Sequence, residues 1–452
     1  MIKNFNSSFK TNFRINITFK AALIFLLTIF LLIPLFLVQS QIEDRSRRYK
    51  DTVREIAHSW ANGQNLRGPV LAVPYEKKVS GKKNRVYTVP GTTYFLPDSL
   101  EFDIKLDPQE RYRGIYKTVV YTSHISAKGK FSLQRDKFPN LFWKQAFLVI
   151  GVSDLRGLVQ TPNVTWNDSA ISCLPGTKSN LFASGLHGML PLSDLSNNKV
   201  SIPFSMTLEL RGSDQFDLLP LGADTRAKIE SSWCHPSFNG NFLPVSRTIS
   251  NQGFESTWQI PHLARGYPKS FDNFQLENIK SAIQESKFGI RMIQPINHYM
   301  LTMRAVKYGV LFILFTFITF FLFELNTRNS LHILQYALVG VSLVTFFLIL
   351  IALSEHLSFV LAYVSASVAV ITQIVLYTYQ TLRSFKSSIA LGGILISLYS
   401  YLYMTLQIED YALLVGAISL FFILSAIMFF TRNIQWYHSD ISQKNNTDKL
   451  EG

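Results

Sequence analysis

Histidine, cysteine and serine are the first residues to test for chemistry, because they bind metals and act as bases and nucleophiles. The nine histidines are scattered, and no HExxH motif or close Cys/His cluster has zinc-ligand spacing. The sequence also lacks a P-loop, a GxGxxG fingerprint and a GxSxG nucleophile elbow. Ser184 and His187 in ASGLHG could pair as nucleophile and base, but a glycine-rich turn is the better interpretation. We therefore predict no enzyme, no metal site and no cofactor.

Three ionisable residues, Glu324, Glu355 and His356, lie beside long apolar stretches. Charged groups inside a membrane are costly and usually functional, which makes these three candidate functional residues. They lie at predicted helix ends, however, where they can reach water, so boundary residues are the favoured interpretation. Arg304 and Lys307 stand where a soluble domain would meet a membrane span. They could couple the two parts or contact lipid phosphates, and ordinary snorkelling is the alternative.

The region between the apolar ends holds the remaining candidates. His235, beside Cys234, could belong to a ligand surface, although a packed strand end more often explains such a cluster. Cys173 and Cys234 could form a disulfide if this region is exported, or remain free buried thiols if it is not. Sequence does not show whether the two are close enough to bond, so both alternatives stay open.

The apolar residues form blocks at the two ends of the chain. Charged residues make up 16% of the 452 residues, below the quarter typical of soluble domains, and mean hydropathy is +0.16. Ala21–Val38 is long enough to cross a membrane and lacks a clear cleavage site, so we expect an uncleaved anchor at residues 21–39. Residues 306–431 divide into five further predicted spans: Val306–Leu325, Ile333–Leu353, Ser358–Tyr379, Ile389–Leu406 and Tyr411–Phe430.

The short loops between these spans predict their orientation. The loops Asn326–His332 and Gln380–Ser388 carry Arg and Lys and no acid, whereas Ser354–Leu357 and Gln407–Asp410 carry acids and no Lys or Arg. Short cytoplasmic loops are rich in Lys and Arg. We therefore predict six spans in a bacterial inner membrane, with both termini in the cytoplasm and the large middle region in the periplasm.

The middle region, residues 40–305, has different periodicities. Apolar residues recur at helical spacing after the first span and predict a stalk helix, from Ile42 to Trp60. Beyond it, SLEFDIKLD (Ser99–Asp107) and SIPFSMTLELRG (Ser201–Gly212) alternate apolar and polar residues. Many such strands without regular intervening helices predict a mainly antiparallel, sandwich-like β domain. The expected fold is thus one anchor helix, an exported β domain and a five-helix membrane bundle, between a leader (1–20) and a tail (432–452).

The formal net charge of +14 is concentrated in this middle region. The leader holds four of the excess positive charges, and the residues between it and the bundle hold the other ten. A basic domain beside a bilayer more plausibly faces anionic headgroups or other envelope polymers than nucleic acid. Membrane lipids and an envelope component or membrane protein are therefore the expected partners, and no nucleic-acid motif supports the other alternative.

A set of short motifs runs in order along nearly the whole chain: RGPVLAVPY (Arg67–Tyr75), FLPDSL (Phe95–Leu100), RGIYKTVVY (Arg113–Tyr121), SWCHPSFNGNFLP (Ser232–Pro244), LARGYP (Leu263–Pro268), RAVKYGVLFI (Arg304–Ile313), FFLFE (Phe320–Glu324), ALSEHLSF (Ala352–Phe359) and EDYALL (Glu409–Leu414). In these motifs the chain resembles the CreD-type inner-membrane proteins, also called cell envelope integrity proteins. The resemblance implies an inner-membrane location and a link to envelope stress. It supplies no agreed catalytic residue or cofactor.

Two functional hypotheses follow. The preferred one is a non-enzymatic envelope protein whose exported β domain binds or senses an envelope component, anchored by the bundle. The alternative is a transporter or lipid-handling protein that works through the five-helix bundle, in which Glu324 and Glu355 would be indispensable. An enzyme acting on cell-wall material ranks third, because it would need titratable residues converging in one cleft.

Overall fold

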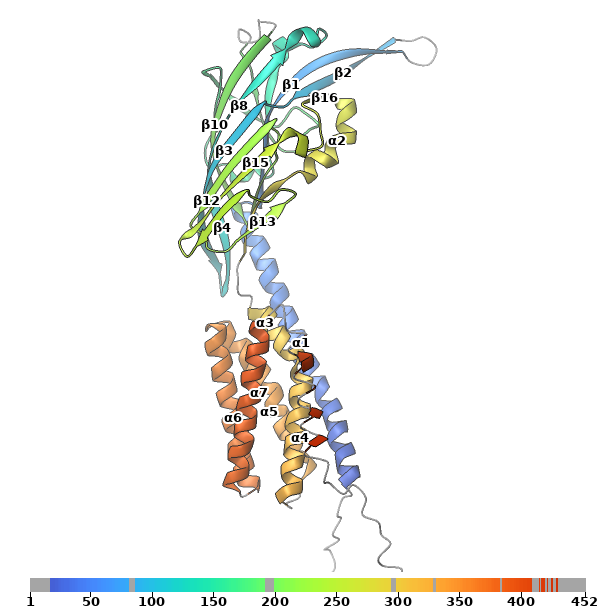
Figure 1. Cartoon of the computed structure of the whole chain (residues 1–452), viewed down its shortest axis with the longest axis vertical. Helices are drawn as coiled ribbons and strands as arrows, with labels where there is room; N and C mark the ends of the chain where they lie inside the picture. The colour runs from blue at the N-terminus through green and yellow to red at the C-terminus, as the bar shows by residue number, and fades with distance from the viewer. Residues whose placement is uncertain are drawn as a thin grey trace, which may run out of the picture. The chain divides into compact units, whose positions relative to one another are not determined.

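The computed structural model describes residues 17–80, 86–191, 199–293, 298–327, 331–382 and 384–408, with scattered positions from 414 to 429. The chain divides into two compact units (Figure 1). One comprises Met1–Arg48 with Asn297–Gly452, and we call it the helical unit. The other comprises Tyr49–Ile296, and we call it the β unit.

The helical unit consists of long apolar helices and one short, mixed helix, α3. Its helices are α1 (Ile17–Trp60, which continues into the β unit), α3 (His298–Lys307), α4 (Gly309–Thr327), α5 (Ile333–Ser354), α6 (Phe359–Leu382) and α7 (Phe385–Gln407). Four helices of the described chain are long and apolar enough to span a membrane, and α3 with α4 make a fifth if the bent pair is one span. The sixth predicted span, Tyr411–Phe430, lies mostly outside the described residues.

Two helix boundaries differ from those predicted. The anchor and the stalk are a single 44-residue helix, α1, which contains Pro34. The second span does not begin at Val306, because α3 already starts at His298 and is followed by a 44° bend before α4. At the bend, a Cβ on Gly309 would lie 2.9 Å from the side chain of Leu35 and 3.1 Å from that of Phe347. The missing side chain therefore lets α4 pack closely on α1 and α5, as small residues do in membrane helices.

The β unit contains two sheets. The first has nine strands, with β13-β17-β11-β1-β5-β9-β8 in one path; β2 also pairs with β1, and β16 pairs with β2. The second has eight strands in the order β14-β15-β12-β3-β4-β10-β6-β7. The strand bounds in the first sheet are β1 Gln64–Ser80, β2 Val86–Phe95, β5 Phe147–Val152, β8 Cys173–Pro175, β9 Gly185–Met189, β11 Gln215–Leu218, β13 Pro236–Gly240, β16 Ser270–Asp272 and β17 Phe288–Met292.

The eight-stranded sheet carries the strongest sequence alternation. Its strands are β3 Ser99–Arg113, β4 Tyr116–Gln134, β6 Asn163–Trp166, β7 Ser169–Ile171, β10 Lys199–Ser213, β12 Asp224–Ser231, β14 Ser246–Ser250 and β15 Gly253–Pro261. Every second side chain of β3, from Leu100 to Leu106, is buried, and those between are exposed or partly exposed. Outward side chains of this sheet therefore form a polar face, while the inward ones pack into the core.

One core joins the two sheets. Its fully buried side chains include Phe102 and Phe131 from the eight-stranded sheet and Phe216 and Phe288 from the nine-stranded one. The expected fold class, apolar helices with a mainly antiparallel β domain, is confirmed. Two strand pairs, β1 with β11 and β3 with β12, are parallel. The remaining elements are α2 (Asn273–Glu285) and short 3-10 turns at Arg135–Lys137, Trp143–Gln145, Leu155–Gly157 and His262–Ala264.

Candidate functional site

The most deeply buried carboxylate among the predicted candidates belongs to Glu324, near the end of α4. Only 7% of this residue is exposed. The Lys20 ammonium forms an ion pair with it, the backbone N–H of Leu331 donates to Oε1 at 3.0 Å, and the Tyr336 hydroxyl donates to Oε2 at 2.7 Å. Lys20 Nζ also donates to the Leu331 carbonyl at 2.6 Å. These contacts join α1, α4 and the start of α5 in one polar network.

This network corrects two predictions. Glu324 is not a boundary residue that reaches water, because helices cover it and a cation neutralises it. The predicted leader does not extend to Lys20, since α1 begins at Ile17 and only 9% of Lys20 is exposed. Neither charge would remain buried without the other, because an isolated ion in an apolar interior pays a desolvation penalty of several kcal/mol. The arrangement therefore acts as a polar link between helices.

A second cluster surrounds Glu355 at the C-terminal end of α5. The Tyr299 hydroxyl of α3 donates to Glu355 Oε1 at 3.1 Å, and Arg45 of α1 lies 3.5 Å from Oε2. The Glu355 side chain is 11% exposed, and that of Arg45 is 46% exposed. The neighbouring His356 is exposed. Glu355 therefore also links helices, while the position of His356 at a membrane boundary stays a prediction.

The predicted candidates of the helical unit do not form one site. Tyr336, which contacts Glu324, and Glu355 are separated by nineteen positions along α5, or roughly 28 Å of helix. Arg304 and Lys307 lie in the last turn of α3, where cations stabilise the helix dipole. Lys307 is exposed and Arg304 is partly buried. No single cleft collects these residues.

The two cysteines and His235 are the remaining predicted candidates, and all three lie in the β unit. Both cysteines are free. Cys173 begins β8 and Cys234 immediately precedes β13, and these strands are the two ends of the seven-strand path, roughly 29 Å apart. The disulfide alternative is therefore wrong, because bonded cysteines need Cα atoms within about 7 Å. His235 is exposed, and its carbonyl accepts from the Trp233 indole N–H at 3.1 Å.

The ASGLHG segment bends at Ala183 and Ser184 and then continues as strand β9 from Gly185, so the predicted turn describes only its first part. His187 lies in β9 and is only 3% exposed. Its Nδ1 lies 2.6 Å from the Gly176 carbonyl oxygen. The histidine is thus a buried core residue held by the backbone, which removes the basis for a nucleophile–base pair with Ser184.

The outer face of the eight-stranded sheet gathers charge in register. One row crosses five neighbouring strands and contains Glu255, Glu230, Lys105, His124 and Glu209. The two ring nitrogens of His124 lie 3.0 Å from Glu209 and 3.1 Å from Asp107. Charged side chains are therefore paired at the β10 end of the row.

At the other end of the row, two carboxylates lie on the neighbouring strands β12 and β15. Glu230 and Glu255 are direct cross-strand neighbours, a like-charge pairing that is unfavourable by itself. Lys228 lies 3.4 Å from Glu255 and 3.6 Å from Glu230. Glu255 first, and Glu230 to a smaller extent, raise the pKa of this exposed lysine. The ammonium of Lys228 thus balances part of the negative charge.

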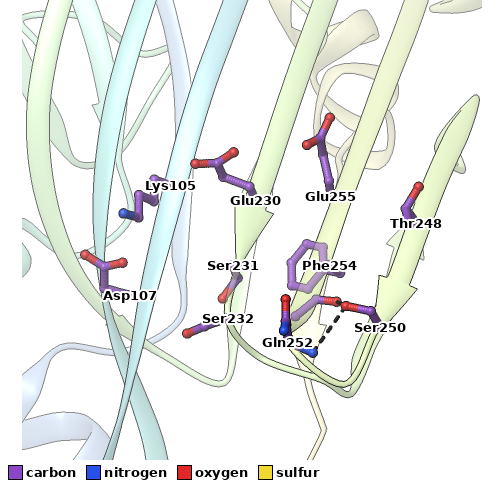
Figure 2. A pocket seen from close by; sticks show the side chains of 11 residues that line it. Lys105, Asp107, Glu230, Ser231, Ser232, Thr248, Ser250, Gln252, Phe254 and Glu255 are labelled. Carbon is purple, nitrogen blue, oxygen red and sulfur yellow. Dashed lines mark hydrogen bonds between the residues drawn. The ribbon is translucent and has the colours of Figure 1, made fainter.

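A shallow pocket of about 650 Å³ opens at this place. Figure 2 shows its lining, which comes from β3, β12, β14 and β15 and from Ser232 and Gln252 in the connections that follow β12 and β14. Its side chains offer carboxylates, hydroxyls, one amide, one amine and one aromatic ring: Lys105, Asp107, Glu230, Ser231, Ser232, Thr248, Ser250, Gln252, Phe254 and Glu255, with Gly253 completing the wall. Such a lining can bind a hydroxyl-bearing ligand through many hydrogen bonds.

The charge of the pocket narrows the ligands it can accept. Asp107, Glu230 and Glu255 outnumber the single amine of Lys105, although the whole middle region is basic. The pocket therefore favours neutral or cationic polar groups over acidic ones. Within the described ranges, no group of three or more His, Cys, Asp and Glu residues is arranged to hold a metal ion.

Sequence reasoning missed this pocket. The alternation already shows that Lys105 and Asp107 face away from the core, but β12, β14 and β15 join β3 only through long-range pairing. The parallel register of Glu230 with Lys105 is not encoded in any local motif. Outward polar positions on neighbouring strands were the only available signal.

Two comparisons with known proteins match nearly the whole chain. A family model described as "Inner membrane protein CreD" matches residues 16–437. The Inner membrane protein CreD of Escherichia coli (strain K12) is 34% identical over 424 residues, which cover 90% of this chain and 91% of that protein. Among solved structures, a substrate-bound mutant of an M1 zinc metallopeptidase from Deinococcus radiodurans has 8% identity, covers 36% of this chain and 39% of its own, and has a TM-score of 0.18, too low to support a shared fold.

Proposed function

Because the chain belongs to the CreD family of inner membrane proteins, we propose that it maintains the bacterial cell envelope by binding one of its polar components. The helices anchor the protein in the inner membrane. The β unit faces the periplasm and carries the binding site, and the protein acts by binding or sensing, without catalysis.

The pocket on the eight-stranded sheet is the observation that carries this proposal. It combines hydroxyls, carboxylates and an amine in about 650 Å³ on an exposed face. Lys105 makes no ion pair with any residue in the described part of the chain, so its amine is available to a ligand. Sugars with free hydroxyl or amino groups match this lining, because they bind through several hydrogen bonds at once. A cell-wall glycan is therefore the ligand class that we favour.

The orientation rests on the charges of the short loops. The loops expected in the cytoplasm carry only basic residues, and those expected outside carry only acidic ones. Arg328, Arg383, Glu409 and Asp410, which contribute to this pattern, lie outside the described residues. The pattern supports a periplasmic β unit with both termini in the cytoplasm.

The binding test uses full-length protein in detergent and purified cell-wall sacculi as the probe. We expect wild-type protein to sediment with the sacculi, and Glu230→Gln or Glu255→Gln to lose most of this binding. Glu101→Gln is the matched control, since Glu101 lies on the outer side of β3 and does not line the pocket. Equal sedimentation of all four proteins would reject the pocket as the site, and no sedimentation of wild type would reject the glycan.

A second candidate function is transport or lipid handling by the helices, favoured by the buried Lys20–Glu324 pair. It predicts that a Lys20→Met and Glu324→Gln double variant fails to restore growth of a deletion strain under envelope stress, even when it reaches the membrane in normal amounts. Normal growth with this variant would count strongly against transport through this network.

A further inference from the structure

The turn between β3 and β4 has an unusual composition for an exposed hairpin. It is a two-residue connection, Gly114–Ile115, in which Gly114 has φ of +61°. Such a φ at the first central position suits glycine, and the second position commonly takes a small polar residue. Here Ile115 occupies it and is 45% exposed, next to Tyr112, which is 65% exposed. One large aliphatic and one large aromatic side chain, the latter with its hydroxyl donating to Glu110, thus extend into solvent at the tip of a long hairpin.

Basic residues flank these two side chains. Arg111, Arg113 and Lys117 lie near the turn of the hairpin, where Glu110 is the nearby acid of the hairpin itself and Glu55 of α1 pairs with Arg113. Lys117 lies 3.1 Å from Glu110, and both side chains are exposed. Exposed pairs of this kind are weak and leave the cations available to other anions. The tip therefore carries an excess of positive charge beside its aliphatic and aromatic side chains.

Contacts with α1 show which way the hairpin points. Within the β unit, Trp60 is stacked by the guanidinium group of Arg111 at 4.5 Å, and its indole N–H donates to the Tyr121 carbonyl at 3.3 Å. Further towards the N-terminus of α1, Glu55 forms an ion pair with Arg113.

The contact nearest the tip uses the earliest residue of α1 in this unit. The rings of Tyr49 and Tyr116 lie 5.9 Å apart. As the hairpin approaches its turn, its partners on α1 thus move from residue 60 to residue 49. The strands run along α1 towards the end from which the helix enters the apolar segment.

Along α1, the residue beside the hairpin turn is close to the apolar segment. The apolar segment ends at Val38, eleven residues before Tyr49, and α1 is helical throughout. A helix rises 1.5 Å per residue, so Tyr49 is about 16 Å along the helix from the end of this segment. The headgroup layer of a bilayer occupies the first ~5–8 Å beyond the hydrocarbon. The residue of α1 that contacts the hairpin beside its turn therefore follows the predicted span by only about three helical turns.

We propose that the β3–β4 hairpin tip is a membrane-contact surface, in which Ile115 and Tyr112 enter the headgroup layer and Arg113 and Lys117 bind lipid phosphates. Tyrosine and aliphatic side chains are favoured at membrane interfaces, and basic residues near the surface are attracted to anionic lipids. The inference uses the membrane anchor and not the pocket, so it stands or falls separately from glycan binding.

The test measures lipid contact at the tip in the full-length protein. A Cys173→Ala and Cys234→Ala background carries either Ile115→Cys or Gln134→Cys, each labelled with an environment-sensitive fluorophore. Gln134 is the matched control, because it is exposed at the opposite end of the same strand, β4. The proteins are reconstituted into vesicles of phosphatidylcholine, or of phosphatidylcholine with phosphatidylglycerol, containing headgroup-labelled quencher lipid.

We expect a blue shift and strong quenching at position 115, greater with phosphatidylglycerol, and neither at position 134. Lys117→Gln should reduce the quenching in the anionic vesicles. Equal signals at the two positions would overturn the proposal. A blue shift at position 115 without quenching would also overturn it, since it would indicate a protein contact. Quenching that is unchanged by lipid charge and by Lys117→Gln would overturn the assignment of the basic residues to phosphates.

Discussion

The helical unit and the β unit place their charged residues in opposite ways. In the helical unit, Lys20 and Glu324 are buried and paired across 304 positions of sequence. In the β unit, outward charges lie in cross-strand rows, and pairs such as Glu101–Lys128 have side chains more than half exposed. The same two residue types therefore serve as a link between helices in one unit and as a solvated polar face in the other.

The difference teaches that the surroundings of an ion pair decide its contribution. Removing one partner of a buried pair costs about 3–5 kcal/mol, because the other charge stays behind without compensation. An exposed pair contributes about 0–1 kcal/mol, because water screens it. A charged residue beside an apolar segment is thus only a candidate site until its partner is known.

The largest expected effect comes from breaking the buried pair. Lys20→Met or Glu324→Gln alone should lower the free energy of unfolding by about 3–5 kcal/mol, since each leaves a polar group buried without its partner. Thermal unfolding in detergent measures the loss. The comparison between the units fails if either single variant is as stable as wild type.

The double variant sharpens the same test. Lys20→Met with Glu324→Gln removes both charges and should recover much of the stability lost in the single variants. If the double variant loses the sum of the two single effects, the residues do not interact, and the network has been misassigned.

An intermediate effect is expected at Asp154 in the β unit. The Arg156 guanidinium donates to its carboxylate at 2.9 and 2.7 Å, and backbone N–H groups of Asn62 and Arg156 add to this. These hydrogen bonds, Arg156 first, hold the pKa of Asp154 well below its usual range. Asp154→Asn should destabilise by about 1 kcal/mol at pH 7, because Arg156 is half exposed and screened.

The stability difference between wild type and Asp154→Asn should depend on pH. A carboxyl group with a lowered folded-state pKa stabilises the fold above its unfolded pKa of about 3.9 and loses that contribution as pH falls further. The melting-temperature difference between wild type and Asp154→Asn should therefore be constant near neutral pH and shrink below about pH 4. A difference that grows in acid would contradict the assignment.

The smallest effect is expected for an exposed row of the β unit. Glu101→Gln removes the partner of Lys128, 3.3 Å away, and should change stability by less than about 1 kcal/mol. Chemical unfolding in urea at low and high salt measures it. A loss comparable to that of Glu324→Gln would erase the contrast between the two units.

Much of the architecture follows from periodicity alone. The alternation in Ser99–Asp107 and Ser201–Gly212 predicts strands that the structure places in β3 and β10. Long apolar segments likewise predict α5, α6 and α7. The parallel pairing of β3 with β12 could not be predicted, because no local residue pattern specifies which distant strand completes a sheet.

The candidate sites were less predictable for the same reason. Glu324 and Glu355 are visible in sequence as acids beside apolar segments, but their partners Lys20 and Arg45 come from a helix about three hundred positions earlier. Without those partners, the sequence favours a position at the membrane boundary for both acids. The pocket depends on the register between strands that are far apart in the sequence. Alternation of apolar and polar residues shows which side chains of one strand face outward, but not which strand lies beside it.

The parallel pairing of β1 with β11 has a consequence for the timing of biosynthesis. β1 starts at Gln64, its partner β11 at Gln215, and β11 in turn pairs with β17, which ends at Met292. Protein synthesis proceeds at about 5–20 residues per second, so β11 leaves the ribosome roughly 8–30 s after β1. The high contact order makes this closure slow, and unpaired strand edges are prone to aggregate meanwhile. Since α3 starts six residues after β17 ends, the nine-stranded sheet is completed only as the ribosome begins the helix that leads into the apolar α4.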